Sequence, residues 1–163
     1  MTNQKNQPQK NKQGFTIIEV VLVLAIAGLI FLMVFIALPA LQRSQRDTQR
    51  RNDMARLATA LTQYQANHGG DLPAAGTDSA TFITGYLGGS TEFNDPSFGE
   101  YTINFEALAN NAEKSLTGDA SQNIYVELGA KCNGEKAKGN NKSREYAILF
   151  KLEGAGTYCQ DNS

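Results

Sequence analysis

Glu19 is the charged side chain whose surroundings most need an explanation. It lies about one turn inside an apolar run that extends from Phe15 to about Leu41 and contains no other charge. An ionised carboxylate in a bilayer core costs several kcal/mol unless it is paired or lies near the interface. Glu19 therefore either reaches back to the lipid headgroups or has a positively charged partner.

Cys132 and Cys159 are the other residues that could do chemistry, and both lie near the C-terminus. They could form one disulfide, remain free thiols, or supply two ligands of a larger metal site. Two cysteines and one histidine, His68, exclude a four-cysteine zinc site and a His-rich site. The sequence also lacks the common nucleophile, nucleotide and zinc-protease motifs, so we expect no catalysis, no cofactor and no bound metal.

Charge is unevenly distributed along the 163 residues, although the net charge is only −1. Residues 71–119 are acidic, whereas residues 131–144 carry Lys131, Lys136, Lys138, Lys142 and Arg144. The basic stretch could bind DNA or another acidic surface. We favour a solvated hairpin loop that pairs with the acidic segment of a neighbouring copy. Asp95 and Glu100 could hold calcium, but a solvated acidic loop is the simpler interpretation.

An uncharged stretch from Val20 to Leu38 sets the first structural element. As a helix it would be roughly 28 Å long, close to the thickness of a bilayer core. This excludes a wholly cytosolic protein, and the lack of a second such run excludes a multi-pass transporter.

The helix is expected to run on from Phe15 to Asn67. Met54, Leu57, Ala58, Leu61 and Tyr64 follow a 3.6-residue period and predict one buried face. The glycine pair at 69–70 then ends the helix. Pro39 is expected to kink the helix without ending it.

The remainder predicts a small β-sheet. Residues 71–121 read as a long variable connector, in which residues 101–112 could form a short strand followed by a helical turn. Residues 123–130, 144–152 and 157–160 are strand-like and favour an antiparallel three-stranded meander that covers the helix. Cys132 follows the first of these strands and Cys159 lies in the third, so the two could meet. The expected fold class is α+β.

The N-terminal residues carry the most specific pattern. A polar leader with Lys5, Lys10 and Lys12 is followed by Gly14, Phe15, Thr16-Ile17-Ile18 and Glu19, and then by the apolar run. This order resembles the prepilin signature of the type IV pilin family in its broad sense. The resemblance is at motif level over residues 14 to about 40, and the long helix and the late cysteine pair extend it.

The resemblance implies a prepilin peptidase that cuts between Gly14 and Phe15 and N-methylates Phe15. It implies a cleaved leader at 1–14, a transmembrane or filament-core segment at 15–41, an amphipathic helical segment at 42–68 and an outward-facing globular domain at 69–163. The leader lysines favour a cytoplasmic N-terminus, although five arginines after the apolar run oppose it: Arg43, Arg46, Arg50, Arg51 and Arg56.

The family also implies roles for single residues. Glu19 would pair with the N-terminal amine of Phe15 in a neighbouring subunit and set the register of the helices. Gly28 and Pro39 would mark a segment that loses helical structure on assembly, or would simply be tolerated in a membrane helix. Many family members place the proline about one turn earlier, so the position of such a segment differs here. Cys132 and Cys159 would form a disulfide.

The implied function is a structural subunit of a type IV pilus for motility, attachment or DNA uptake. The alternative is a minor pilin or a pseudopilin of a type II secretion or competence system. A tip adhesin, a DNA-capturing subunit and a single-pass enzyme or sensor are weaker alternatives. The expected partners are copies of itself, prepilin peptidase, an assembly platform with its motor ATPase, and DNA or a host surface. The chain would span the cytoplasmic membrane once, C-terminus outside, and then join an extracellular filament.

Overall fold

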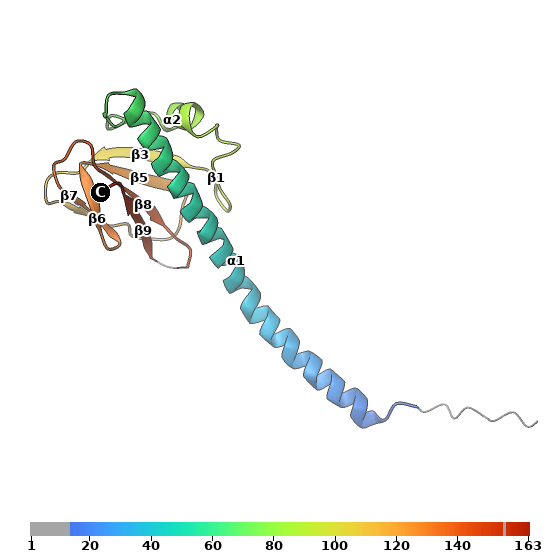
Figure 1. The fold of residues 1–163 in the computed structure, drawn as a ribbon. Helices are drawn as coiled ribbons and strands as arrows, with labels where there is room; N and C mark the ends of the chain where they lie inside the picture. Colours follow the sequence, from blue (N-terminus) through green and yellow to red (C-terminus); the bar gives the residue numbers. More distant parts are fainter. Residues whose placement is uncertain (1–13, 155) are drawn as a thin grey trace, which may run out of the picture. The chain divides into compact units, whose positions relative to one another are not determined.

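The computed structural model describes residues 14–154 and 156–163, in two compact units, Met1–Pro39 and Ala40–Ser163. Residues 1–13 of the predicted leader, which ends at Gly14, lie outside the described residues. Helix α1, Ile17–Asn67, contributes to both units (Figure 1). The predicted C-terminal end of this helix is confirmed. Gly69 and Gly70 adopt positive φ angles of 66° and 97°, which a glycine tolerates without strain.

The second unit is built on a four-stranded sheet in the order β3-β5-β8-β9. Its strands are β3 Thr102–Ala107, β5 Asn123–Leu128, β8 Tyr146–Lys151 and β9 Thr157–Asp161. The β5-β8-β9 part is antiparallel, which confirms the predicted meander. Strand β3 adds a parallel edge beside β5. The sheet is therefore mixed, and the α+β fold class is confirmed.

The two faces of this sheet bury different partners because side chains alternate along each strand. Ile124, Val126 and Ile148 lie in the core that α1 covers. From α1, Met54, Leu57 and Leu61 reach the same core and are fully buried, as their spacing predicts. Short helix α2, Ser79–Tyr86, adds Phe82 to this core, which makes a helical layer on one face of the sheet (Figure 1).

The opposite face packs on a second, three-stranded sheet in the order β4-β7-β6. Its strands are β4 Glu113–Lys114, β6 Ala130–Asn133 and β7 Lys136–Gly139. Ala130 and Ala137 of this sheet meet Leu149 of β8. At Gly139 the backbone passes so close to the Ala109 carbonyl that a Cβ would collide with it.

Two expectations about irregular segments were wrong. The 71–121 connector contains the expected short strand, β3, but also α2, β4 and a small hairpin of β1 Asn94–Asp95 with β2 Gly99–Glu100. The predicted basic loop at 131–144 is largely the β6-β7 hairpin, turned at Gly134 with φ of 64°. In β6 and β7, lysines on the outer face alternate with alanine or cysteine on the inner face. This period-two pattern is so weakly apolar that it does not predict strands clearly.

Candidate functional site

The predicted cleavage point lies in non-helical backbone immediately before α1. Gly14, Phe15 and Thr16 precede the first helical residue, and the Phe15 side chain is 90% exposed. A Cβ added at Gly14 would meet no atom of the described residues within 4 Å. Packing within the chain therefore does not require glycine at position 14. A requirement for glycine there would come from a protein that binds this segment.

Glu19 has a partner that the sequence analysis missed, namely Thr16. One Glu19 carboxylate oxygen accepts hydrogen bonds from the Thr16 backbone N–H and from the Thr16 hydroxyl, both at 2.8 Å. The Glu19 N–H donates to the Thr16 hydroxyl at 3.4 Å. These reciprocal bonds form a capping box at the start of α1. Thr16 and Glu19 have the T-x-x-E spacing of that motif, so the signal was present in the sequence.

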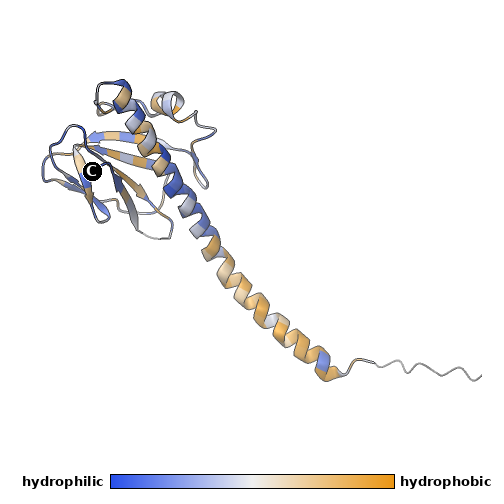
Figure 2. Cartoon of the chain, in the orientation of Figure 1, coloured by the Kyte–Doolittle hydropathy of each residue, from blue (hydrophilic) through white to orange (hydrophobic). Residues whose placement is uncertain are grey.

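The first part of α1 consists almost entirely of hydrophobic residues (Figure 2), and its large apolar side chains are exposed. It contains an 18-residue window long and apolar enough to cross a membrane, and none of that window is buried within the chain. Gly28 and Pro39 both lie in regular helix. A Cβ at Gly28 would meet no atom within 4 Å, so the chain itself does not use this glycine for packing. Their role in local melting stays a prediction.

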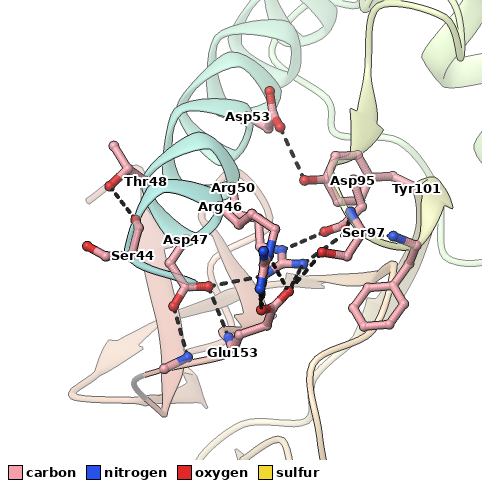
Figure 3. Close-up of polar contacts among 12 residues, drawn as sticks. Ser44, Arg46, Asp47, Thr48, Arg50, Asp53, Asp95, Ser97, Tyr101 and Glu153 are labelled. Carbon is pink, nitrogen blue, oxygen red and sulfur yellow. Dashed lines mark hydrogen bonds and ion pairs between the residues drawn. The ribbon is translucent and has the colours of Figure 1, made fainter. Parts of the chain in front are cut away.

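A buried ion cluster around Arg50 lies where α1 meets the β-domain (Figure 3). The Arg50 side chain has no exposed surface and donates to both carboxylate oxygens of Asp95, at 2.6 and 2.9 Å. It also donates to Glu153 at 2.7 Å and to Asp47 at 3.1 Å. A buried arginine needs such paired acceptors, because an uncompensated buried charge costs about 3–5 kcal/mol.

The turn between β8 and β9 is attached to α1 by the same cluster. Asp47 accepts the backbone N–H groups of Glu153 and Gly154, at 3.0 and 2.9 Å. Glu153 in turn accepts from Arg46 at 2.6 Å and from the Ser97 hydroxyl at 2.9 Å. This network of charge-assisted hydrogen bonds attaches α1 to two loops that are far apart in sequence. One contains Asp95 and Ser97, and the other is the β8-β9 turn.

The pKa values of these groups are shifted by their hydrogen bonds and by burial. The hydrogen bonds from Arg46, with those from Arg50 and Ser97, lower the pKa of Glu153 to about 2 against the opposing effect of burial. Burial alone would lower the pKa of Arg50, but its bonds to Asp95 and Glu153 raise it. Burial raises the pKa of Asp53, despite the 3.2 Å bond from the Tyr101 hydroxyl. Glu153 and Arg50 are therefore both charged at neutral pH.

Arg46 and Arg50 are two of the five cations whose charge opposes the expected orientation. In the folded domain both are held by carboxylates. Asp95 is neither a calcium ligand nor part of a solvated loop, because its carboxylate is fully buried against Arg50. A signal for this existed in the sequence. Arg50 continues the buried stripe of Met54, Leu57 and Leu61 by one helical turn.

The predicted cysteine pair is joined. Cys132 of β6 and Cys159 of β9 form a disulfide with a Cα–Cα distance of 5.9 Å. The bond links the small sheet to the edge strand of the large one. Within residues 14–154 and 156–163, no group of three or more His, Cys, Asp or Glu side chains is arranged to hold a metal ion.

The five predicted surface cations separate into two groups. Lys142 pairs with Glu145 at 2.6 Å, and Arg144 donates to the Gly69 carbonyl at 3.4 Å. The other three share the outer face of the β4-β7-β6 sheet. On that face Lys138 lies opposite both Lys131 and Glu113, and Lys136 is 3.4 Å from Glu113.

That outer face is positively charged. Three lysines share one carboxylate there, and like charges directly opposite each other in a sheet are destabilising. An external anionic group would relieve this repulsion. We call Lys131, Lys136, Lys138 and Glu113 the lysine face.

Comparison with known proteins adds a match to the N-terminal region. Residues 9–35 match the family model described as the prokaryotic N-terminal methylation motif. Searches of curated proteins and of solved structures gave no match. The matched segment contains Gly14, Phe15, Thr16 and Glu19, together with the exposed apolar start of α1. The chain thus carries the class III signal peptide of type IV pilins, and this motif supports a type IV pilin-like or pseudopilin protein.

Proposed function

We propose that the chain is a structural subunit of a type IV pilus and polymerises through the first part of α1. The observation that carries this proposal is the methylation motif followed by an apolar helix segment in which no residue of the membrane-length window is buried within the described chain. Such a surface needs lipid before assembly and other copies of the same helix afterwards. The domain from Ala40 onward has its own core and would form the outer layer of the filament.

Processing would convert the precursor into the polymerising form. Prepilin peptidase would cut after Gly14 and methylate the new amine of Phe15. That cation would then attract Glu19 of a neighbouring subunit. Within its own chain, the Glu19 carboxylate accepts hydrogen bonds from Thr16. On assembly, Glu19 would either give up these bonds for the neighbouring amine or accept from both partners. An assembly platform and its motor ATPase would supply the energy, and the subunit itself would need no catalytic group.

The test is intact-mass and N-terminal peptide analysis of sheared surface material and of membranes from the same cells. We expect the sheared fraction to be dominated by a chain that starts at methylated Phe15. The same processed chain confined to membranes would instead identify a minor pilin or a pseudopilin of a secretion or competence system. Residues 1–14 still attached in both fractions would contradict the proposal.

A pair of glycine variants sharpens this test. Gly14→Val is expected to abolish cleavage, because a side chain would enter the peptidase site next to the scissile bond. Gly28→Ala is the matched control for processing, since neither glycine has an atom of its own chain within 4 Å of an added Cβ. It is expected to be cleaved like the parent. Normal cleavage of Gly14→Val would place the cut elsewhere.

A further inference from the structure

A polar groove lies beside the part of α1 that immediately follows the apolar run. It has a volume of about 420 Å³ and is lined by Arg43, Ser44, Thr48 and Arg51 of α1 and by Gly154 of the β8-β9 turn. Ala40 also lines it, and the apolar run ends at Leu41. In a membrane-inserted chain this stretch of α1 would lie at the level of the lipid headgroups.

The two arginines in the groove differ from their neighbours. Arg46 and Arg50 are held by carboxylates, whereas the residues that the structure describes provide no ion pair for Arg43 or Arg51. Both are exposed, and the Arg51 guanidinium lies 5.9 Å from the ring centre of Tyr158. The groove therefore has two cations available for an external anion.

Asp47 is the one acid in the lining, and its charge is already used. Its carboxylate accepts hydrogen bonds from Arg50 and from the backbone N–H groups of Glu153 and Gly154. Thr48 is also engaged, since its hydroxyl donates to the Ser44 carbonyl at 2.8 Å. The Arg43 and Arg51 guanidinium groups, with the Ser44 hydroxyl, remain as donors toward the groove.

We propose that this groove binds the phosphate of an anionic phospholipid while the chain waits in the membrane. Guanidinium groups match phosphate oxygens in charge and in planar geometry. The Ser44 hydroxyl would add one hydrogen bond, and the acyl chains would stay in the bilayer that surrounds the apolar run. This inference rests on the membrane-inserted stage of the proposed function, and it implies that the lipid is released when the subunit leaves the membrane.

Native mass spectrometry of the full chain in a non-ionic detergent tests the proposal. Phosphatidylglycerol and phosphatidylcholine are titrated separately, and the dissociation constant of the first bound lipid is measured. We expect tighter binding of phosphatidylglycerol. Arg43→Gln with Arg51→Gln is expected to weaken it by about 30-fold, since each cation at an anionic membrane surface contributes about a factor of five.

Arg56→Gln with Lys151→Gln is the matched control, because it removes two charges from positions outside the groove lining. We expect this variant to bind phosphatidylglycerol like the parent. An equal loss in the control, or equal affinity for the two lipids, would overturn the proposal. So would displacement of the lipid by millimolar inorganic phosphate, which would assign the groove to free phosphate. The measurement needs neither cleavage nor filaments, so its failure is distinct from failure of the pilus proposal.

Discussion

Glu153 holds two arginines of α1 at once, and this arrangement governs how the cluster responds to acid. Its carboxylate oxygens lie 2.6 Å from Arg46 and 2.7 Å from Arg50. Since the pKa of Glu153 falls from 4.5 to about 2 on folding, the folded state is favoured while this group stays ionised. That stabilisation is present above pH 4.5 and is lost as the pH falls through about 2.

Glu153→Gln is therefore expected to lower the free energy of unfolding by roughly 2 to 3 kcal/mol at pH 7, with a difference that shrinks between pH 4.5 and 2. Urea unfolding of the full chain in detergent, followed by near-ultraviolet circular dichroism of the buried tyrosines, measures this. Burial raises the pKa of Asp53 and Glu127, and these two groups therefore change the pH dependence of stability in the direction opposite to Glu153. Their contribution is the same in variant and parent, so it cancels in the difference between the two free energies of unfolding.

Glu100→Gln is the control for this measurement, because Glu100 is exposed and no ion pair reaches it within the described part of the chain. It should change the free energy of unfolding little at any pH. A pH-independent loss in Glu153→Gln would show that the carboxylate matters only for its shape and hydrogen bonds.

At the scale of elements, the helix and strands that the sequence predicted correctly are those with a strong periodic pattern of apolar residues. The end of α1 at Asn67 and the strands β5, β8 and β9 follow from apolar spacing and turn residues. The β6-β7 hairpin was missed because its inward residues are small, although Gly134 at the first position of the two-residue turn is a known hairpin signal. The Arg50 cluster was missed for a different reason. A charged residue on a helix is normally solvated, and its burial depends on acids about 45 and 103 residues away.

The disulfide contributes at this same scale, because it joins β6 to β9 across 27 residues of sequence. Cys132→Ser with Cys159→Ser is expected to lower the free energy of unfolding by about 3 to 4 kcal/mol through loop-closure entropy. Urea unfolding of the full chain in detergent provides the measurement. Dithiothreitol should shift the parent toward the variant and leave the variant unchanged. A parent insensitive to reduction under unfolding conditions would contradict this expectation.

At the scale of the whole molecule, the chain is suited to two surroundings. The first part of α1 exposes side chains such as Phe31 and Phe35, whereas residues from Ala40 onward bury their apolar side chains within a domain. The sequence was sufficient to predict this division, because hydropathy changes at Leu41. It was not sufficient to show which surface charges remain without an internal partner, since that depends on strand pairing.

The lysine face leads to a prediction about contacts between copies. We expect Lys131 and Lys138 to meet acidic residues of a neighbouring subunit, because their own sheet supplies one carboxylate for three lysines. Lys131→Gln with Lys138→Gln should reduce the sheared filament fraction and lower its sensitivity to salt. The Arg56→Gln and Lys151→Gln control should not. Intact filaments that no longer retain DNA would instead assign the lysine face to DNA capture.

The bonds between α1 and the β8-β9 turn also set an order of events during biosynthesis. Asp47 is translated long before Glu153 and Gly154, which follow it by 106 and 107 residues. Until those residues leave the ribosome, Arg46 has no carboxylate from the turn and Arg50 lacks one of its acids. If the chain is inserted into the membrane as proposed, the insertion machinery would therefore meet this stretch of helix before its arginines have all their acidic partners. In the proposed topology, the domain would complete its fold only after the last strands have followed the helix across the bilayer.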